Sequence, residues 1–171
     1  MRKSPPPNGS EHIFTMKRWD GPVGRGNNNC YAYAMNDYKI MMFVSTCKPT
    51  STLCHGDFHF YKQHSKTEYK IKRGDTHEII AKFFKVPVTR IKRAAKVLLP
   101  GKVITFKAEF FSHKRGWATG PLTTGATGKL IKDPRTTSRK YPGMNYNKYC
   151  GSFCIKNGGV KVGHTHPKVR K

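Results

Sequence analysis

Alternating polar and apolar residues predict the strands of this chain. Residues 57–62 read Asp-Phe-His-Phe-Tyr-Lys, and a period of two places Asp57, His59 and Tyr61 on one face of a strand. The apolar run at 40–44 fits either a buried strand or the continuation of a helix. The remaining pattern predicts strands over 110–117, 130–134 and 150–155, with loops over 120–128 and 141–149.

The middle of the chain has a different period. A short strand over 69–73 is followed by a Gly74 turn and by Thr76 as a helix cap. A second cap at Thr89 and a closing strand over 103–106 complete a strand–helix–helix–strand unit. The spacing of its apolar residues predicts a core made of Ile79, Ile80, Phe83, Ile91 and Ile104.

A short helix is expected near the N-terminus, over residues 31–35. Asn residues at 27–29 offer an N-cap, so Cys30 falls on the first helical turn. Unpaired backbone N–H groups and the positive end of the helix dipole stabilise a thiolate there and lower the thiol pKa. Cys30 is therefore a candidate nucleophile, and the alternative is a small buried cysteine at a helix start.

Charge dominates the composition. The 33 Lys and Arg residues outnumber nine Asp and Glu residues, which gives a net charge of +24. Such a surplus needs an anionic partner: nucleic acid, a membrane face, an acidic glycan or acidic protein neighbours in an assembly. No motif that reads nucleic acid appears, so nucleic acid is the less favoured partner. No apolar window is long enough to span a membrane, and the start of the chain lacks the apolar region of a signal peptide.

The five cysteines leave their pairing open. If Cys30 is a free thiol, the other four allow three disulfide connectivities or remain reduced. Their spacing is unusual for zinc, and His164 and His166 fit a solvated tail better than a metal site. No metal or other cofactor is expected. The other four cysteines are Cys47, Cys54, Cys150 and Cys154.

Residues 69–106 resemble a LysM module. The matching pieces are Tyr-x-Ile-x-x-Gly-Asp-Thr at 69–76, Ile-Ile-Ala at 79–81, Val-Pro-Val at 86–88 and Leu-Pro-Gly-Lys-Val-Ile at 99–104. The resemblance implies binding of glycans that contain N-acetylglucosamine, such as peptidoglycan or chitin. Ala95 departs from the family, which often has Asn there, and a spacer used only for packing is the alternative. The residues that the resemblance assigns to glycan binding are Gly74, Asp75, Thr76, Leu99, Pro100 and Gly101.

With this unit set aside, a cysteine at a helix start is followed by a histidine in each of two successive strands. This order, with Cys-Tyr-Ala-Tyr-Ala, Asp-x-His-x-Tyr and Ser-His-Lys segments, resembles NlpC-type and CHAP-type papain-like proteins of bacteria, phages and large algal DNA viruses. The resemblance implies Cys30 as nucleophile, with its backbone N–H in the oxyanion hole, His59 as general base and His113 as the residue that orients His59. Asp57 is a rival orienting residue. The alternatives are a core histidine at 59 and a turn histidine at 113.

The expected fold is α+β, a papain-like helix-plus-antiparallel-sheet core with an inserted βααβ LysM-like module. Two functions fit it. One is a virion-associated minor capsid protein of a large DNA virus, held by acidic neighbours, whose Cys–His–His amidase or peptidase activity is left open. The other is an active cell-wall hydrolase targeted by the module without a signal peptide. The expected parts are an arm over 1–24, a core over 25–67 and 107–157, the insertion over 68–106 and a basic tail over 158–171.

Overall fold

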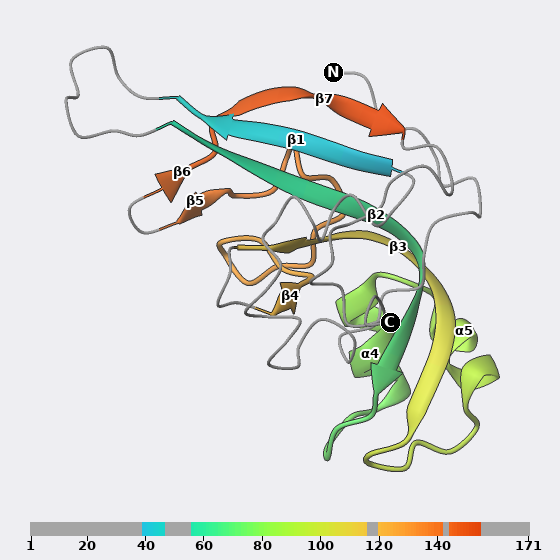
Figure 1. The fold of residues 1–171 in the computed structure, drawn as a ribbon. Helices are drawn as coiled ribbons and strands as arrows, with labels where there is room; N and C mark the ends of the chain where they lie inside the picture. Colours follow the sequence, from blue (N-terminus) through green and yellow to red (C-terminus); the bar gives the residue numbers. More distant parts are fainter. Residues whose placement is uncertain (1–38, 47–55, 116–119, 142–143, 155–171) are drawn as a thin grey trace, which may run out of the picture.

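The computed structural model describes residues 39–46, 56–115, 120–141 and 144–154. Within them the fold is α+β, with a five-stranded antiparallel sheet in the order β4-β3-β2-β1-β7, a two-stranded sheet and two helices (Figure 1). The expected α+β class is confirmed at this level. The elements are β1 (Lys39–Ser45), β2 (Asp57–Lys70), α4 (His77–Phe84), α5 (Val88–Ala94), β3 (Val103–Lys114), β4 (Pro121–Leu122), β5 (Lys140–Tyr141), β6 (Met144–Asn145) and β7 (Lys148–Cys154).

The two longest strands, β2 and β3, pair antiparallel and are connected through α4 and α5; we call this pair the long hairpin. Its pairing extends from Tyr61 opposite His113 to Lys70 opposite Val103, with a register shift between His64 and Lys66. The prediction of separate short strands at 57–62 and 69–73, and at 103–106 and 110–117, was therefore wrong. Nothing in the intervening residues breaks a strand, and alternating burial continues through 107–109. The expected boundaries at 67/68 and 106/107 fall inside these two strands.

The hairpin carries a separate hydrophobic core at each end. Helices α4 and α5 lie against its far end, where the strands curve away from the rest of the sheet (Figure 1). The core beneath them consists of Ile71, Ile80, Ala81, Phe84, Ile91, Ile104, Phe106, Ala108, Phe110 and Leu130. The second core lies on the five-stranded sheet and consists of Met41, Phe43, Tyr61, Phe111, Ile131 and Tyr146.

The order strand–helix–helix–strand is confirmed over residues 69–106. Thr76 caps α4 as expected, since its side chain accepts a hydrogen bond from the backbone N–H of Ile79 at 3.2 Å. Two core predictions were wrong, because Ile79 is 53% exposed and Phe83 is 41% exposed. The helix turns Ile80, Ala81 and Phe84 inward instead, which leaves the stripe at 79 and 83 on its outer face.

The described residues 120–141 and 144–146 pack on the sheet with little regular structure. The strand expected over 130–134 is reduced to one bridge between Thr124 and Leu130. Its backbone pairs elsewhere: the N–H of Phe111 in β3 donates to the carbonyl of Ile131 at 2.7 Å. The loop expected over 141–149 was also wrong, because this stretch contains the end of β5, the whole of β6 and the start of β7. Short strands of two residues give too weak a sequence pattern to detect.

Two cations close the outer edge of β3. Arg90 donates from Nη1 to the carbonyl of Lys107 at 3.1 Å, and Lys132 donates from Nζ to the carbonyl of Glu109 at 2.6 Å. Both carbonyls lie on the stretch of β3 that β4 does not reach. Satisfying them in this way protects an edge strand from pairing with another chain.

Candidate functional site: a buried histidine pair and a two-turn surface

His59 and His113 come together on adjacent strands. His59 lies on β2 and His113 on β3, where His113 is the register partner of Tyr61, two residues along. This diagonal placement brings Nε2 of His59 to 2.7 Å from Nδ1 of His113. Both side chains are buried. The hydrogen bond expected between them is therefore present, although their catalytic roles stay predictions.

The second partner of His113 fixes the direction of this hydrogen bond. Nε2 of His113 lies 3.0 Å from the carbonyl oxygen of Thr124. A carbonyl oxygen only accepts, so Nε2 of His113 carries the proton. Nδ1 of His113 is then unprotonated and accepts a hydrogen bond through its lone pair. His59 must then donate from Nε2 to His113. The Nδ1 of a neutral His59 is consequently unprotonated, which is the form that a general base requires.

Burial keeps both imidazoles neutral. It is the largest cause lowering the pKa of His59, and the neighbouring His113 and Arg115 lower that pKa further. Burial also lowers the pKa of His113 to about 4. The hydrogen bond to the Thr124 carbonyl raises this pKa by a smaller amount, and the charge of Arg115 lowers it by less again. The pair therefore remains uncharged at neutral pH. His113 can accept a hydrogen bond there without taking up a proton itself.

Tyrosines surround the two imidazoles. Tyr146 stacks on His59 with ring centroids 4.7 Å apart, and Tyr61 stacks on His113 at 5.0 Å. The ring centroid of Tyr141 lies 6.1 Å from that of His113. The guanidinium of Arg115 lies over the Tyr141 ring, 5.3 Å from its centroid. These contacts restrict ring rotation and exclude water.

Asp57, the rival orienting residue, is engaged elsewhere. Its Oδ2 accepts a hydrogen bond from the hydroxyl of Tyr146 at 2.8 Å, and its Oδ1 accepts from the N–H of Phe58 at 2.8 Å. Asp57 thus holds the tyrosine that stacks on His59, one step removed from the imidazole. Thr124, Tyr141 and Tyr146 were missed by sequence reasoning, because they lie in irregular segments that no periodicity marks.

The candidate nucleophile Cys30, with its backbone N–H in the expected oxyanion hole, lies outside the described residues, as do Cys47, Cys54, His164 and His166. Cys150 and Cys154 are free, exposed thiols on β7. Within the described part of the chain, no group of three or more His, Cys, Asp and Glu residues is placed to hold a metal ion. No helix in that same part is long and apolar enough to cross a membrane.

The six residues assigned to glycan binding gather at one end of the βααβ unit. They lie on two turns, over 72–76 and 99–102, which we call the two-turn surface. The turns are joined because Ile71 donates to the carbonyl of Lys102 at 2.9 Å and Gly101 donates to that of Ile71 at 2.8 Å. Gly74 and Gly101 have φ angles of 89° and 87°, a conformation that favours glycine. The turns are therefore side by side and locally fixed.

Side chains hold the first turn against β2 and link the two helices to each other. Oδ2 of Asp75 accepts hydrogen bonds from the Tyr69 hydroxyl at 2.8 Å and from the Lys72 N–H at 2.7 Å. Burial and this hydrogen bond to Asp75 raise the pKa of Tyr69 to about 12. Nε2 of His77 lies 2.8 Å from the carbonyl of Ala95 and links the start of α4 to the end of α5. Asp75 and Thr76 therefore have structural roles here, and Leu99 is exposed.

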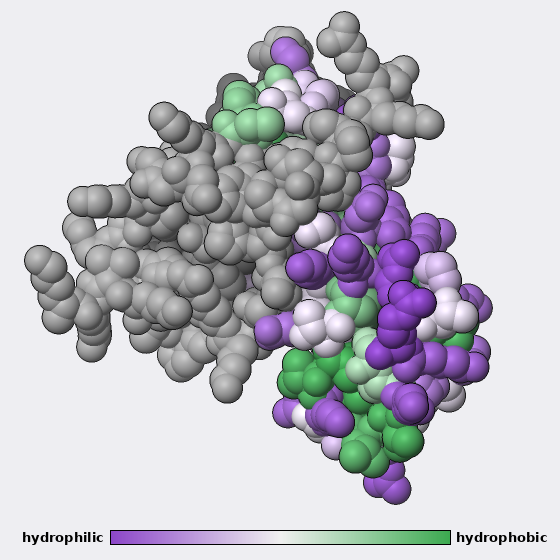
Figure 2. Space-filling model, turned by 90° about the vertical axis from the view of Figure 1, so that its right-hand side faces the viewer, coloured by the Kyte–Doolittle hydropathy of each residue, from purple (hydrophilic) through white to green (hydrophobic). Residues whose placement is uncertain are grey.

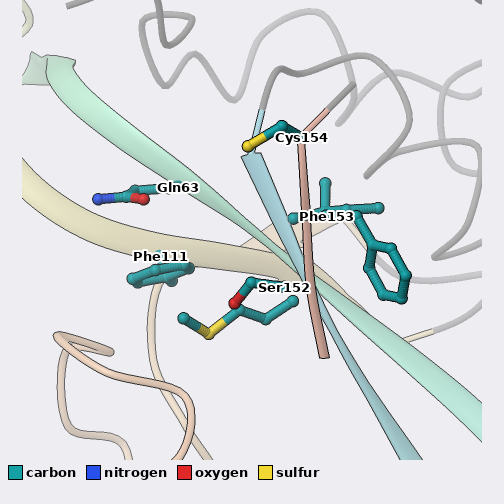
Figure 3. A pocket seen from close by; sticks show the side chains of 7 residues that line it. Gln63, Phe111, Ser152, Phe153 and Cys154 are labelled. Carbon is teal, nitrogen blue, oxygen red and sulfur yellow. The ribbon is translucent and has the colours of Figure 1, made fainter. Parts of the chain in front are cut away.

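A small hollow is lined by residues of four strands of the five-stranded sheet, β1, β2, β3 and β7 (Figure 3). Its lining comes from Ile40, Met41, Gln63, Phe111, Ser152, Phe153 and Cys154. A volume of about 20 Å³ has room for roughly one water molecule. It is too small to hold a peptide or a sugar.

The chain has no match among protein-family models, curated proteins or solved structures. Its function is consequently inferred from the histidine pair and the two-turn surface.

Proposed function

We propose that this chain is a cysteine amidase or peptidase acting on a glycan-rich cell wall, with Cys30 as nucleophile, His59 as general base and His113 as positioning residue. The observation that carries the proposal is the directed hydrogen-bond chain from His59 through His113 to the Thr124 carbonyl. A core histidine needs only one backbone partner. Here a second buried imidazole is itself fixed and serves to hold the first, which is the logic of a catalytic triad.

The proposed reaction assigns a separate step to Cys30, His59 and His113. Nδ1 of His59 takes the proton from the Cys30 thiol, and the thiolate attacks the carbonyl carbon of an amide. The tetrahedral intermediate collapses to a thioester as the imidazolium gives its proton to the leaving amine. Water activated by His59 then hydrolyses the thioester and regenerates the thiol. Throughout, Nε2 of His59 donates to neutral His113, which keeps the ring in one orientation.

The βααβ unit supplies the expected targeting. Its confirmed element order and its two joined turns support the LysM-like interpretation, in which the two-turn surface binds an N-acetylglucosamine-containing glycan. The amide substrate would then be a peptide or acyl group attached to that glycan, as in peptidoglycan or a chitin-like wall.

A cysteine-specific comparison tests the enzyme. The purified protein, Cys30→Ala, His59→Gln and His113→Gln are incubated with peptidoglycan, and released amines are measured. Cys154→Ala removes a free, exposed thiol and is the matched control. We expect Cys30→Ala and His59→Gln to lose about 10²-fold or more of the rate, and Cys154→Ala to keep it. Full activity of Cys30→Ala would refute the proposal.

A second candidate is a virion-associated structural component of a large DNA virus. The net charge of +24 favours it, since such a chain is well suited to acidic neighbours in a capsid. In this case the protein stays with particles in moderate salt and is released as salt screens its charges. Salt-washed particles separate the two functions. Tight retention with no cysteine-dependent cleavage supports the structural role, and easy loss with cleavage supports the hydrolase.

A further inference from the structure

The two-turn surface is strongly basic. Five cationic side chains lie on the two turns and beside them, and all five are exposed; they are Lys70, Lys72, Arg73, Lys96 and Lys102. The backbone bonds that join the turns bring cations from both ends of the βααβ unit together. Cations about 30 residues apart in the sequence therefore lie on one surface.

These charges are not neutralised from within the described residues. The ion pairs found there join Lys92 to Glu78 at 3.9 Å and Arg135 to Asp133, and neither includes one of the five cations. The acid on the two-turn surface, Asp75, already accepts hydrogen bonds from Tyr69 and from the backbone of Lys72. The surface consequently presents several unpaired cations to a ligand.

Apolar side chains lie among the cations. Val97 is 65% exposed and Leu99 56% exposed on the connection that ends in the second turn. Figure 2 shows the lobe with α4 and α5 as apolar patches bordered by hydrophilic side chains. Exposed apolar groups of this kind offer contact area to the C–H faces of sugar rings, and the surrounding cations attract negative groups.

We propose that the two-turn surface binds an acidic glycan, one that carries carboxylates along the chain, in preference to a neutral N-acetylglucosamine polymer. The inference rests on the proposed glycan-binding function and names its ligand class. A neutral polymer adds no negative charge to the five mutually repelling cations, which outnumber the acid on this surface, Asp75. A glycan with a carboxylate at regular intervals compensates them while its ring faces rest on Val97 and Leu99.

The test compares two hexasaccharides of equal length by calorimetry. Chitohexaose is neutral, whereas a hyaluronan hexasaccharide alternates N-acetylglucosamine with glucuronic acid. We expect hyaluronan to bind about tenfold more tightly at low salt and the difference to shrink as salt screens the charges. The triple variant Lys72→Gln, Arg73→Gln, Lys102→Gln should lose this preference and keep its affinity for chitohexaose.

A charge-matched control removes three exposed lysines outside the two-turn surface: Lys129→Gln, Lys140→Gln and Lys148→Gln. It should keep the preference for hyaluronan. Equal or tighter binding of chitohexaose by the unaltered protein would overturn the acidic-glycan inference and leave the proposed glycan function standing. Binding of neither sugar would refute the glycan function itself. Binding of hexathymidylate as tightly as hyaluronan, with the same loss in the triple variant, would show a general polyanion surface and also overturn the inference.

Discussion

At the scale of single residues, the role proposed for His113 differs from that of the usual third member of a hydrolytic triad. A carboxylate in that place would stabilise a protonated base through its charge. His113 is neutral, so it contributes orientation alone, and its own orientation comes from the Thr124 carbonyl and the ring of Tyr61. Burial, followed by the neighbouring His113 and Arg115, keeps the pKa of His59 low. We therefore expect the proposed hydrolase activity to persist into mildly acidic solution.

The depressed pKa of His113 predicts a loss of stability in acid. Its pKa is about 4 in the folded protein and near 6.5 when unfolded, so between these values the unfolded chain binds more protons. Stability is therefore fully present above pH 6.5 and falls as the pH drops toward 4, by about 3 kcal/mol if this group acts alone. Urea unfolding at pH 7 and pH 4.5 measures the change, and a His113→Gln variant should show a smaller one. An equal slope in both proteins would contradict this assignment.

Arg115 offers a separate test of the same electrostatics. Its charge lowers the pKa of both His59 and His113, while its side chain is exposed at the end of β3. Arg115→Gln removes the charge without opening the buried pair, so the pKa of His113 should rise. NMR titration of the imidazole resonances follows this shift, with Arg135→Gln as a control that removes a different arginine charge. An unchanged His113 pKa would show that Arg115 does not act on the pair.

The sequence predicted the histidine pair but not the groups that fix it. His59 was placed by strict alternation in its strand, and His113 by its position in the next strand once the βααβ unit was set aside. Thr124 and Tyr146 reach the pair from segments where neither a period of two nor one of 3.6 applies. Their roles depend on how irregular backbone folds over the sheet, which single-residue patterns do not encode.

At the scale of elements, α4 shows why a helical period alone gives an incomplete core. Ile79, Ile80, Phe83 and Phe84 form two parallel apolar stripes, and either could have faced inward. The helix cap and the link from His77 to Ala95 set the rotation of α4, and they turn Ile80 and Phe84 toward the hairpin. Tertiary contacts thus decide between stripes that the sequence leaves equivalent.

A matched pair of substitutions in α4 tests this rotation. Ile80→Ala removes a buried side chain and should lower the free energy of unfolding by about 2–5 kcal/mol. Ile79→Ala makes the same chemical change at the next, exposed position and should cost less than about 1 kcal/mol. Thermal or urea unfolding measures both. Similar losses from the two substitutions would mean that α4 faces the hairpin differently.

At the scale of the whole molecule, one hairpin joins two cores. The sequence indicated an inserted unit ending at residue 106, and the core beneath the helices extends beyond that residue. Ala108, Phe110 and Leu130 also belong to the core beneath the helices. β2 and β3 are each one continuous strand. The alternation of polar and apolar residues along them therefore does not mark where one core ends and the other begins.

Fragment stability should reflect this extended core. A fragment of residues 66–111 retains Ala108 and Phe110, whereas one of residues 68–106 lacks both. We expect the longer fragment to be more stable by about 1.5–3 kcal/mol, the contribution of burying one large apolar side chain. Circular dichroism melts of the two fragments provide the comparison. Equal stability would show that the unit is complete at residue 106.

The paired strands β2 and β3 also fix the distance between the two-turn surface and the histidine pair. β3 extends from Val103, beside the two-turn surface, to His113. At about 3.3 Å per residue this path is roughly 30 Å, somewhat less in a straight line because the strands curve (Figure 1). No flexible linker separates the two ends of β3. If one end holds a polymer and the other cuts, the bond that is cut lies at a fixed reach from the point of attachment, and that reach would set the spacing of the products.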